Sequence, residues 1–209
     1  MGYKFLDTIA TPSVRAAQAA NGSGDLWDNF KGRRIFDHFS DNEAAFIAER
    51  DSFYMATVSE NGWPYVQHRG GPRGFLKLLD EKTLAFADFR GNSQYISLGN
   101  IAANDRVALI LVDYPNRARL KILAHMEARD LTTAPELAER LALPGYKGKV
   151  ERAFVLHLET FDWNCSQHIT PRFTMTDIEP AVSSLQGRIA ELQAENQGLR
   201  ARIAAHAAG

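Results

Sequence analysis

Two cations flank a glycine-rich corner in the middle of the chain, and both suit a phosphate group. Arg69 ends one strand-like segment, Gly70–Gly74 forms the corner, and Lys77 lies in the segment that returns. Arginine suits phosphate because its planar guanidinium can donate two parallel hydrogen bonds. A polar loop at residues 92–94 follows the next strand and offers neutral donors. These residues are expected to hold a phosphate-bearing cofactor against a sheet, although a surface hairpin with solvated cations fits the same spacing.

Cys165 and His168 form a second pair whose types and spacing could do chemistry. A thiolate nucleophile needs a base and an orienting group, and no Asp or Asn partner for a triad is identifiable. A zinc site needs about four ligands, and no second ligand pair lies nearby. We therefore expect neither nucleophilic catalysis nor a metal site here.

The elements that must position these residues are predicted to be β-strands. From about residue 51, apolar and polar residues alternate with a period of two. Asn61-Gly62 is a strong hairpin signal between two of the strands. Because most connections are too short for a parallel crossover, we expect a mainly β fold with an antiparallel sheet closed into a barrel. The expected strands are 53–59, 63–69, 75–79, 83–88, 106–113, 117–128 and 152–161, with helices at 93–103 and 133–143.

Residues 1–50 are expected to form an N-terminal helical arm. A short helix should run from Ser13 to Ala20, because Thr11-Pro12 reads as an N-cap followed by proline at the first helical position. Ser40 and Glu43 form a capping box that opens a second helix, which should end near Arg50.

Residues 177–209 change to a seven-residue repeat. β-Branched residues and one asparagine occupy one position of the heptad, leucines occupy a second, and this pattern favours a parallel two-stranded coiled coil. An amphipathic helix packed on its own barrel is the alternative, and exposed Gly187 and Gly198 weaken the helix. The first set is Val182, Ile189, Asn196 and Ile203, and the second is Leu185, Leu192 and Leu199.

Composition limits the class of protein. Hydrophobic residues make up 45% and charged residues 23% of the 209 residues, as in ordinary globular proteins. The net charge of −1 gives no basic field for nucleic acid, and no apolar run reaches the roughly 20 residues that span a bilayer. The start of the chain lacks a signal-peptide core, and the single cysteine cannot form an internal disulfide. A cytoplasmic protein that binds neither nucleic acid nor membrane is expected.

Several short motifs follow one another in an order that resembles the pyridoxamine 5'-phosphate oxidase-like family of FMN-binding split barrels. They are the Arg69–Lys77 segment, Ala87-Asp88, the loop 91–94, Asn104-Asp105-Arg106-Val107 and Trp163. The resemblance covers roughly residues 51–172. It implies an FMN-binding antiparallel split β-barrel at 51–176 and a homodimer with the cofactor at the interface.

The resemblance also implies a set of cofactor-binding residues. Arg69 and Lys77 match the strand pair at the phosphate and ribityl chain, and Arg119 matches a flavin-contacting position. The segment after the last strand resembles the wall supplied by the partner subunit. Where the family usually offers cations after the next strand, this chain has neutral residues. The implied set is Arg69, Phe75, Leu76, Lys77, Ala87, Asp88, Asn92, Ser93, Gln94, Arg119, Trp163, Gln167 and His168.

The function implied is that of an FMN-dependent oxidoreductase with a small-molecule redox substrate that the sequence does not identify. Pyridoxamine phosphate oxidases end in a basic, histidine-containing segment, whereas this chain has Gln167–Arg172 and then the heptads. Oxidation of vitamin B6 is therefore not expected. Two alternatives remain open at this point: a non-catalytic flavin-binding sensor, and a split barrel that uses a deazaflavin or haem.

Overall fold

The computed structural model describes residues 3–30, 32, 34–163 and 167–207, and the chain divides into two compact units. The larger unit comprises residues 1–113 and 117–167, and the smaller comprises residues 114–116 and 168–209. The family-like motifs up to Trp163 all lie in the larger unit. No helix in the described part of the chain is long and apolar enough to cross a bilayer.

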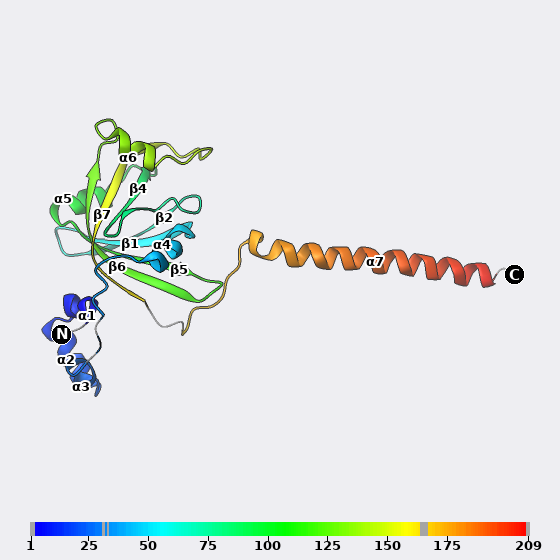
Figure 1. Cartoon of the computed structure of the whole chain (residues 1–209), viewed down its shortest axis with the longest axis horizontal. Helices are drawn as coiled ribbons and strands as arrows, with labels where there is room; N and C mark the ends of the chain where they lie inside the picture. The colour runs from blue at the N-terminus through cyan, green and yellow to red at the C-terminus, as the bar shows by residue number, and fades with distance from the viewer. Residues whose placement is uncertain (1–2, 31, 33, 164–166, 208–209) are drawn as a thin grey trace. The chain divides into compact units, whose positions relative to one another are not determined.

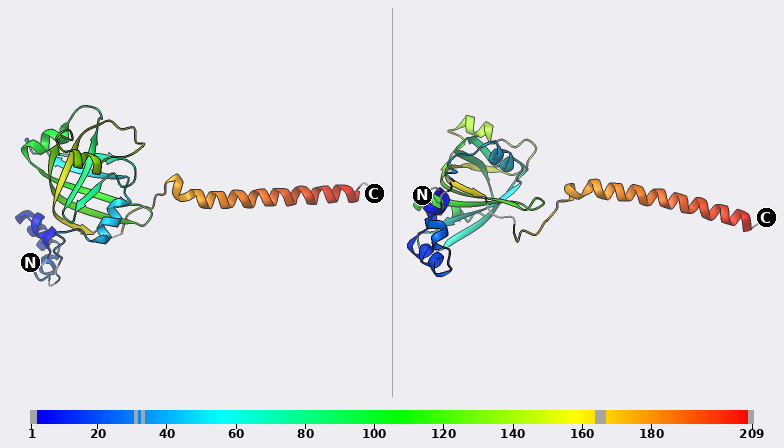
Figure 2. Two further views of the ribbon diagram at one scale, coloured as in Figure 1. Left: turned by 45° about the horizontal axis from the view of Figure 1, so that its top comes forward. Right: turned by 60° about the horizontal axis from the view of Figure 1, so that its bottom comes forward.

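A seven-stranded antiparallel sheet forms the body of the larger unit and curls around its main hydrophobic core (Figure 1, Figure 2). The strand order is β2-β1-β5-β6-β7-β4-β3. This arrangement confirms the predicted split barrel. The strands are β1 (Ser52–Val58), β2 (Pro64–Gly70), β3 (Lys77–Asp80), β4 (Thr83–Phe89), β5 (Arg106–Asp113), β6 (Ala118–Arg129) and β7 (Val150–Trp163).

The barrel closes by side-chain packing and not by a continuous hydrogen-bonded ladder. Among the described residues, β2 and β3 are the two edges of the sheet. Phe53 on β1 stacks on Phe75, which precedes β3, with ring centroids 5.6 Å apart and planes 9° apart. The expectation that the segments on either side of the glycine corner lie on adjacent strands is therefore wrong. The corner at Gly71 and Gly74 instead carries the chain from one edge of the sheet to the other.

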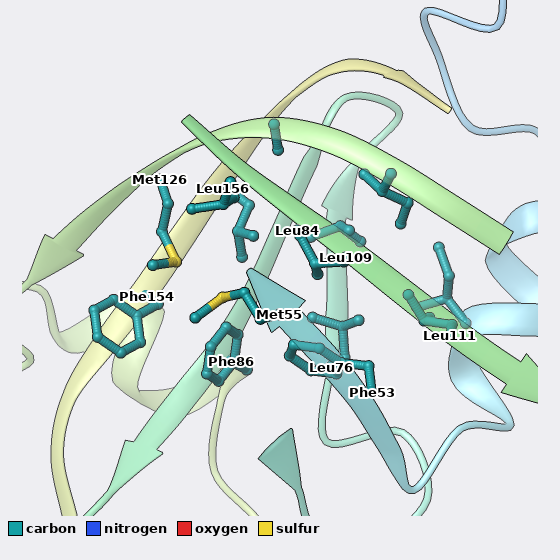
Figure 3. Packing of buried hydrophobic residues seen from close by; sticks show 14 of the residues in the cluster. Phe53, Met55, Leu76, Leu84, Phe86, Leu109, Leu111, Met126, Phe154 and Leu156 are labelled. Atoms are coloured by element: carbon teal, nitrogen blue, oxygen red, sulfur yellow. The ribbon is translucent and has the colours of Figure 1, made fainter. Parts of the chain in front are cut away.

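The main core lies on the inner face of the sheet, where alternate residues of β1, β4, β5, β6 and β7 point inward (Figure 3). β5 shows this alternation most simply, because Val107, Leu109 and Leu111 are buried while the residues between them are partly exposed. Phe86 from β4 packs edge-on against Phe53, with ring centroids 5.3 Å apart. Burial of these rings and aliphatic side chains is the main force that holds the barrel together.

Short helices of the N-terminal arm and of the loops between strands surround the barrel. The capping box that opens α4 is confirmed, since Glu43 accepts from the backbone N–H of Ser40 while Ser40 Oγ caps the first turn. The arm carries two short helices, α1 and α3, that the sequence pattern did not predict. The helices of this unit are α1 (Lys4–Ile9), α2 (Pro12–Ala20), α3 (Gly24–Asp28), α4 (Asp41–Ala48), α5 (Ile96–Ala103) and α6 (Pro135–Arg140).

Tyr3 ties the arm to the barrel. Its hydroxyl donates to Asp162 on β7, and its backbone bridges Arg34. Burial, and then the hydrogen bond to Asp162, raise the pKa of Tyr3 to about 12. Lys121 on β6 reaches the second oxygen of the same carboxylate at 2.8 Å. The arm is thus held by a buried carboxylate that serves two partners.

Helix α5 is shorter at its start than predicted. The pattern placed its beginning at Ser93, but the helix starts at Ile96. Ser93 and Tyr95 have positive φ angles of 61° and 50°, a left-handed conformation that an α-helix cannot include. The residues of the polar loop therefore form an irregular turn in front of the helix.

The smaller unit contains one long helix, α7 (Met175–Ala207), preceded by an extended segment. Thr174 and Asp177 form a capping box at its start: Thr174 Oγ1 accepts from the backbone N–H of Asp177, and the Asp177 carboxylate accepts from the backbone N–H of Thr174. Pro180 lies inside the helix, within its second turn. The observed helix includes all the predicted heptad positions from Val182 to Ile203.

Candidate functional site

A small recess lies where the ends of β2 and β4, the start of β7 and the loop before α5 come together. Its volume is about 50 Å³. A cavity of roughly 10–15 Å³ is the least that holds one water, so the recess has room for a small group such as a phosphate and not for a whole nucleotide. The lining residues are Tyr65, Gln67, Arg69, Asp88, Phe89, Gly91, Asn92, Ser93, Gln94, Tyr95, Ile96, Ser97, Leu98, Glu151 and Phe154.

Arg69 is the cation at the centre of this recess. Its Nη1 donates to Asp88 Oδ1 at 2.8 Å, and its guanidinium carbon lies 5.5 Å from the centroid of the Phe154 ring. The side chain is 14% exposed. Its Nε is buried and has no hydrogen-bond partner among the described residues. A buried donor without a partner carries a desolvation penalty of about 1–3 kcal/mol, which an acceptor on a ligand could remove.

Arg152 is a second, partly buried cation next to the same carboxylate. It lies directly opposite Asp88 in the register of β4 and β7. Its Nη1 is 3.7 Å from Asp88 Oδ2, too far for a hydrogen bond, and has no hydrogen-bond partner in the described part of the chain. Arg152 was missed at the level of sequence, because a charged residue near the start of a strand gives no sign of which residue will face it.

Asp88 lies between these two arginines. Burial raises its pKa above the usual range for a carboxyl, while Arg69 and Arg152 oppose that rise. With Asp88 and Glu151 both ionised, the two carboxylates balance the charges of Arg69 and Arg152. What favours a further acceptor is the pair of arginine nitrogens that neither carboxylate reaches, Arg69 Nε and Arg152 Nη1.

The polar loop forms the opposite wall of the recess. Gln94 donates its backbone N–H to Asn92 Oδ1 at 3.1 Å, which closes a tight turn. Tyr95, in left-handed conformation, then precedes the first residue of α5. No side chain caps this helix, so its first N–H groups have no such acceptor, and the positive end of the helix dipole lies beside the recess.

Glu151 fixes this loop to the barrel. Its Oε1 accepts from Arg90 Nε at 2.7 Å and from Tyr95 Oη at 3.3 Å, and its Oε2 accepts from Arg152 Nη2 at 3.3 Å. The hydrogen bond from Arg90 is the first cause that holds the pKa of Glu151 below its usual range. Glu151 thus orients both the loop and Arg152, and sequence reasoning did not identify it either.

The structure brings five of the thirteen expected cofactor residues to this recess. They are Arg69, Asp88, Asn92, Ser93 and Gln94. Phe75, Leu76 and Ala87 are buried, the first two as members of the main core. Lys77 is half-buried on β3, opposite Ala85, and does not line the recess.

The remaining four expected residues lie elsewhere in the chain. Arg119 is on β6, and its buried Nε has no hydrogen-bond partner within the described ranges. Gln167 and His168 are both exposed. Trp163 ends β7, where its Nε1 donates to Glu43 Oε1 at 2.6 Å and its ring meets Phe46 edge-on. Cys165, of the Cys-His pair considered above, lies outside the described residues.

Trp163 and the recess occupy opposite ends of one strand. Glu151 and Phe154, near the start of β7, line the recess, whereas Trp163 is the last residue of the strand. From Phe154 to Trp163 the strand extends about 30 Å. Along this strand of one chain, therefore, the tryptophan is far from the arginines. Among the residues that the structure describes, no cluster of ligating side chains could hold a metal ion.

The features of the recess fit a phosphate group. Arg69, which lines it, and Arg152, which pairs with the same Asp88, each have a buried nitrogen without a partner among the described residues. The neutral loop residues 92–94 also line the recess, and its volume suits a small group such as one phosphate. The neutral residues at 92–94 leave the charge to Arg69 and Arg152. The recess is too small for a flavin ring, so any attached ring system must lie outside it.

Comparison with known proteins identifies the chain's relatives. The family model described as pyridoxamine 5'-phosphate oxidase matches residues 39–155, more than half of the chain. None of the curated proteins compared with the chain matches it. The helix α7 lies outside the matched range.

Solved structures also resemble the chain at low identity. A protein from Lactobacillus delbrueckii, described as a candidate pyridoxamine 5'-phosphate oxidase, is 20% identical, with a TM-score of 0.47 over 60% of this chain and 94% of that one. An FMN-binding protein from Syntrophomonas wolfei is 14% identical, with a TM-score of 0.45 over 73% and 95%. An F420 reductase is 21% identical, with a TM-score of 0.38 over 56% and 93%. At these values the neighbours do not by themselves indicate a function.

Proposed function

The chain belongs to the pyridoxamine 5'-phosphate oxidase family, and on that premise we propose that it is a homodimeric FMN-dependent oxidoreductase. The observation that carries the proposal is the pair of buried arginine nitrogens without partners, on Arg69 and Arg152, beside a recess of phosphate size. A cofactor with a terminal phosphate in the recess would supply an acceptor for Arg69, which lines it, with Arg152 next to Asp88 as the second donor. The expectation of FMN, in place of riboflavin, rests on this feature.

The phosphate end of the cofactor is held by charge and by the loop. Arg69 and Arg152 supply charge-assisted donors, and Asp88 and Glu151 keep the two guanidinium groups oriented. The side chains of Asn92, Ser93 and Gln94 and the first N–H groups of α5 donate from the opposite wall. Lys77 lies outside the phosphate recess and is assigned no contact with the phosphate.

The flavin end of the cofactor is held between two chains. Because Trp163 lies about 30 Å along β7 from the recess, it reaches a cofactor bound at Arg69 of the other protomer rather than its own. Gln167 follows Trp163 closely in the chain and is assigned to the same wall, with His168 as the next candidate.

Large apolar residues are exposed on the β1–β2 hairpin, which carries Arg69: Tyr54 is 42%, Trp63 73% and Val66 61% exposed. A second copy that covered them would bury apolar surface.

The bound flavin would supply the redox chemistry, by transfer of a hydride or of single electrons. The residues of the chain bind the phosphate, fix the position of the ring and exclude water from one of its faces. Arg119, whose buried Nε lacks a partner, is the cation assigned to steady negative charge near the ring. The chain continues from Arg172 into α7 and not into a basic, histidine-containing end, so a vitamin B6 phosphate is not the proposed substrate.

The test is the identity of the molecule that co-purifies with the protein. We expect a yellow protein with the absorption of an oxidised flavin, from which FMN is released and identified by its mass. A deazaflavin or haem spectrum would contradict the choice of cofactor. Reduction of the bound flavin by a nicotinamide, followed by reoxidation with oxygen or a dye, is expected for an oxidoreductase. A flavin that no donor reduces would favour a sensor.

A further inference from the structure

Helix α7 carries an apolar stripe that nothing in its own unit covers. The helix has 33 residues, Met175–Ala207, and none of them is buried. At 1.5 Å per residue it is about 50 Å long. Leu185 is 64% exposed, Ile189 54% and Ile203 69%. Helices in water are stabilised chiefly by packing of such a stripe, so the stripe calls for a partner.

The stripe follows a heptad repeat through the helix. With Val182 at position a, the preceding heptad has Met175 at a and Ile178 at d. The repeat therefore begins at the first residue of the helix. Ile189 and Ile203 are also at a, and Leu185, Leu192 and Leu199 are at d. A seven-residue repeat is the signature of a helix that supercoils around another helix, because an isolated amphipathic helix on a flat surface follows a 3.6-residue period.

We propose that α7 pairs with α7 of a second copy of the chain as a parallel, in-register, two-stranded coiled coil. β-Branched residues at a and leucine at d favour two parallel strands. Asn196 at a favours the same arrangement. In a parallel pair its amide faces the identical amide of the partner, whereas in an antiparallel pair it would face an apolar d residue without a hydrogen-bond partner.

Two further features favour pairing along this seam. Glu195 at g and Arg200 at e are placed to form an ion pair between the chains of a parallel dimer. The residues that disfavour a helix lie away from the seam: Pro180 and Gly187 are at f, and Gly198 is at c. They weaken the isolated helix without disturbing the packing layer. The proposal concerns α7 alone and does not rest on the proposed flavin chemistry.

The test uses disulfide cross-linking in the full-length chain. Cys165 is first replaced by serine, so that each variant has one cysteine. Ile189→Cys places a thiol at a, and Ala194→Cys places one at f on the outer face of the same helix. In a parallel, in-register pair the two a-position thiols lie close enough for a disulfide, and the f-position thiols do not.

We expect Ile189→Cys to form interchain disulfides under mild oxidation at least about tenfold faster than Ala194→Cys, because pairing raises the local thiol concentration. Circular dichroism checks that both variants remain helical. Equal rates, or no cross-link from Ile189→Cys in a helical protein, would overturn the proposal. A mixture of Leu185→Cys and Ile203→Cys chains that cross-links between opposite ends faster than either variant alone would indicate an antiparallel pair and would also overturn it.

Discussion

Arg69 and Asp88 form an ion pair across the opening of the barrel, with Nη1 and Oδ1 2.8 Å apart. Arg69 is on β2, one edge of the sheet, and Asp88 is on β4, next to the opposite edge, so the two strands are not hydrogen-bonded neighbours. The pair therefore joins the two ends of the sheet at the mouth of the recess. Arg152, facing Asp88 from β7, and Glu151, which accepts from Arg152, complete a cluster of two cations and two carboxylates.

Replacement of Arg152 by glutamine is expected to weaken FMN binding by about 1–2 kcal/mol, because one charge-assisted donor is lost and Glu151, which orients the loop, loses one of its donors. Titration of the apoprotein with FMN measures the change. Arg129→Gln is the matched control, since Arg129 is an exposed arginine of the neighbouring strand that pairs with Glu127 and not with the carboxylates of the recess. If both variants bind FMN equally well, Arg152 plays no part in holding the phosphate.

A shared site is tested by mixing two defective chains. Arg69→Ala removes the phosphate partner, and Trp163→Ala removes the proposed wall. If the site draws on both protomers, a heterodimer of the two variants has one intact site out of two, and FMN binding should partly recover. Isolation of tagged heterodimers and flavin fluorescence give the measurement. Heterodimers that bind no better than either homodimer would mean that each site is built from one chain.

The hydrogen bond from Trp163 to Glu43 is expected to make the protein sensitive to acid. Burial alone would raise the pKa of Glu43, but hydrogen bonds from Ser40 and Trp163 outweigh it and hold that pKa below its usual range. The unfolded chain then binds a proton more readily than the folded one. The stability from this carboxylate is therefore present above its unfolded pKa of about 4.5 and is lost as the pH falls through the lower folded value.

Trp163→Phe should accordingly lower the free energy of unfolding at pH 7 by about 1–2 kcal/mol through the lost hydrogen bond. The deficit should shrink as the pH falls below about 4.5 and through the lowered pKa of Glu43, because the protonated carboxyl no longer favours the folded state in this way. Urea denaturation at several pH values measures it. Glu43→Gln serves as the control, because it removes the titrating group. A deficit that stays constant with pH would assign the effect of Trp163 to packing against Phe46 alone.

Asn196→Leu is expected to raise the thermal stability of the paired α7 helices. It should also allow oligomers other than the two-stranded dimer. A buried asparagine at a costs stability but selects a parallel dimer, and leucine removes both effects. Analytical ultracentrifugation and thermal unfolding of the full-length chain measure them. Gln197→Leu, one residue along at the outer b position, is the control and should change neither. A variant that stays strictly dimeric and becomes less stable would mean that Asn196 does not lie in a coiled-coil seam.

Local patterns in the sequence sufficed for most of the fold. The period-two runs gave the seven strands, Asn61-Gly62 marked the hairpin, and Ser40 with Glu43 marked the start of α4, because each depends on neighbours in the chain. Which strands pair across long stretches of sequence could not be predicted from such local patterns. The segments flanking the glycine corner looked like a hairpin, but they diverge to the two edges of the sheet.

The site was predictable only in part for the same reason. Arg69 and the loop at 92–94 could be found from residue type and order, and they do line one recess. Arg152 and Glu151 could not, since their roles depend on the register of β7 against β4 and on the path of the loop. Lys77 was placed with Arg69 because it is near in sequence, and the crossing to the other edge separates it from the recess.

The central claim, that Arg69 binds the phosphate of FMN, is tested most directly by comparing FMN with riboflavin. Calorimetric titration of the apoprotein and of Arg69→Ala with both ligands forms a thermodynamic cycle, with Arg73→Ala as a control from the exposed side of the same corner. The account predicts that Arg69→Ala weakens FMN binding by about 1.5–3 kcal/mol and leaves riboflavin binding nearly unchanged, because riboflavin has no phosphate. Equal losses for both ligands, or an unchanged affinity for FMN, would contradict it.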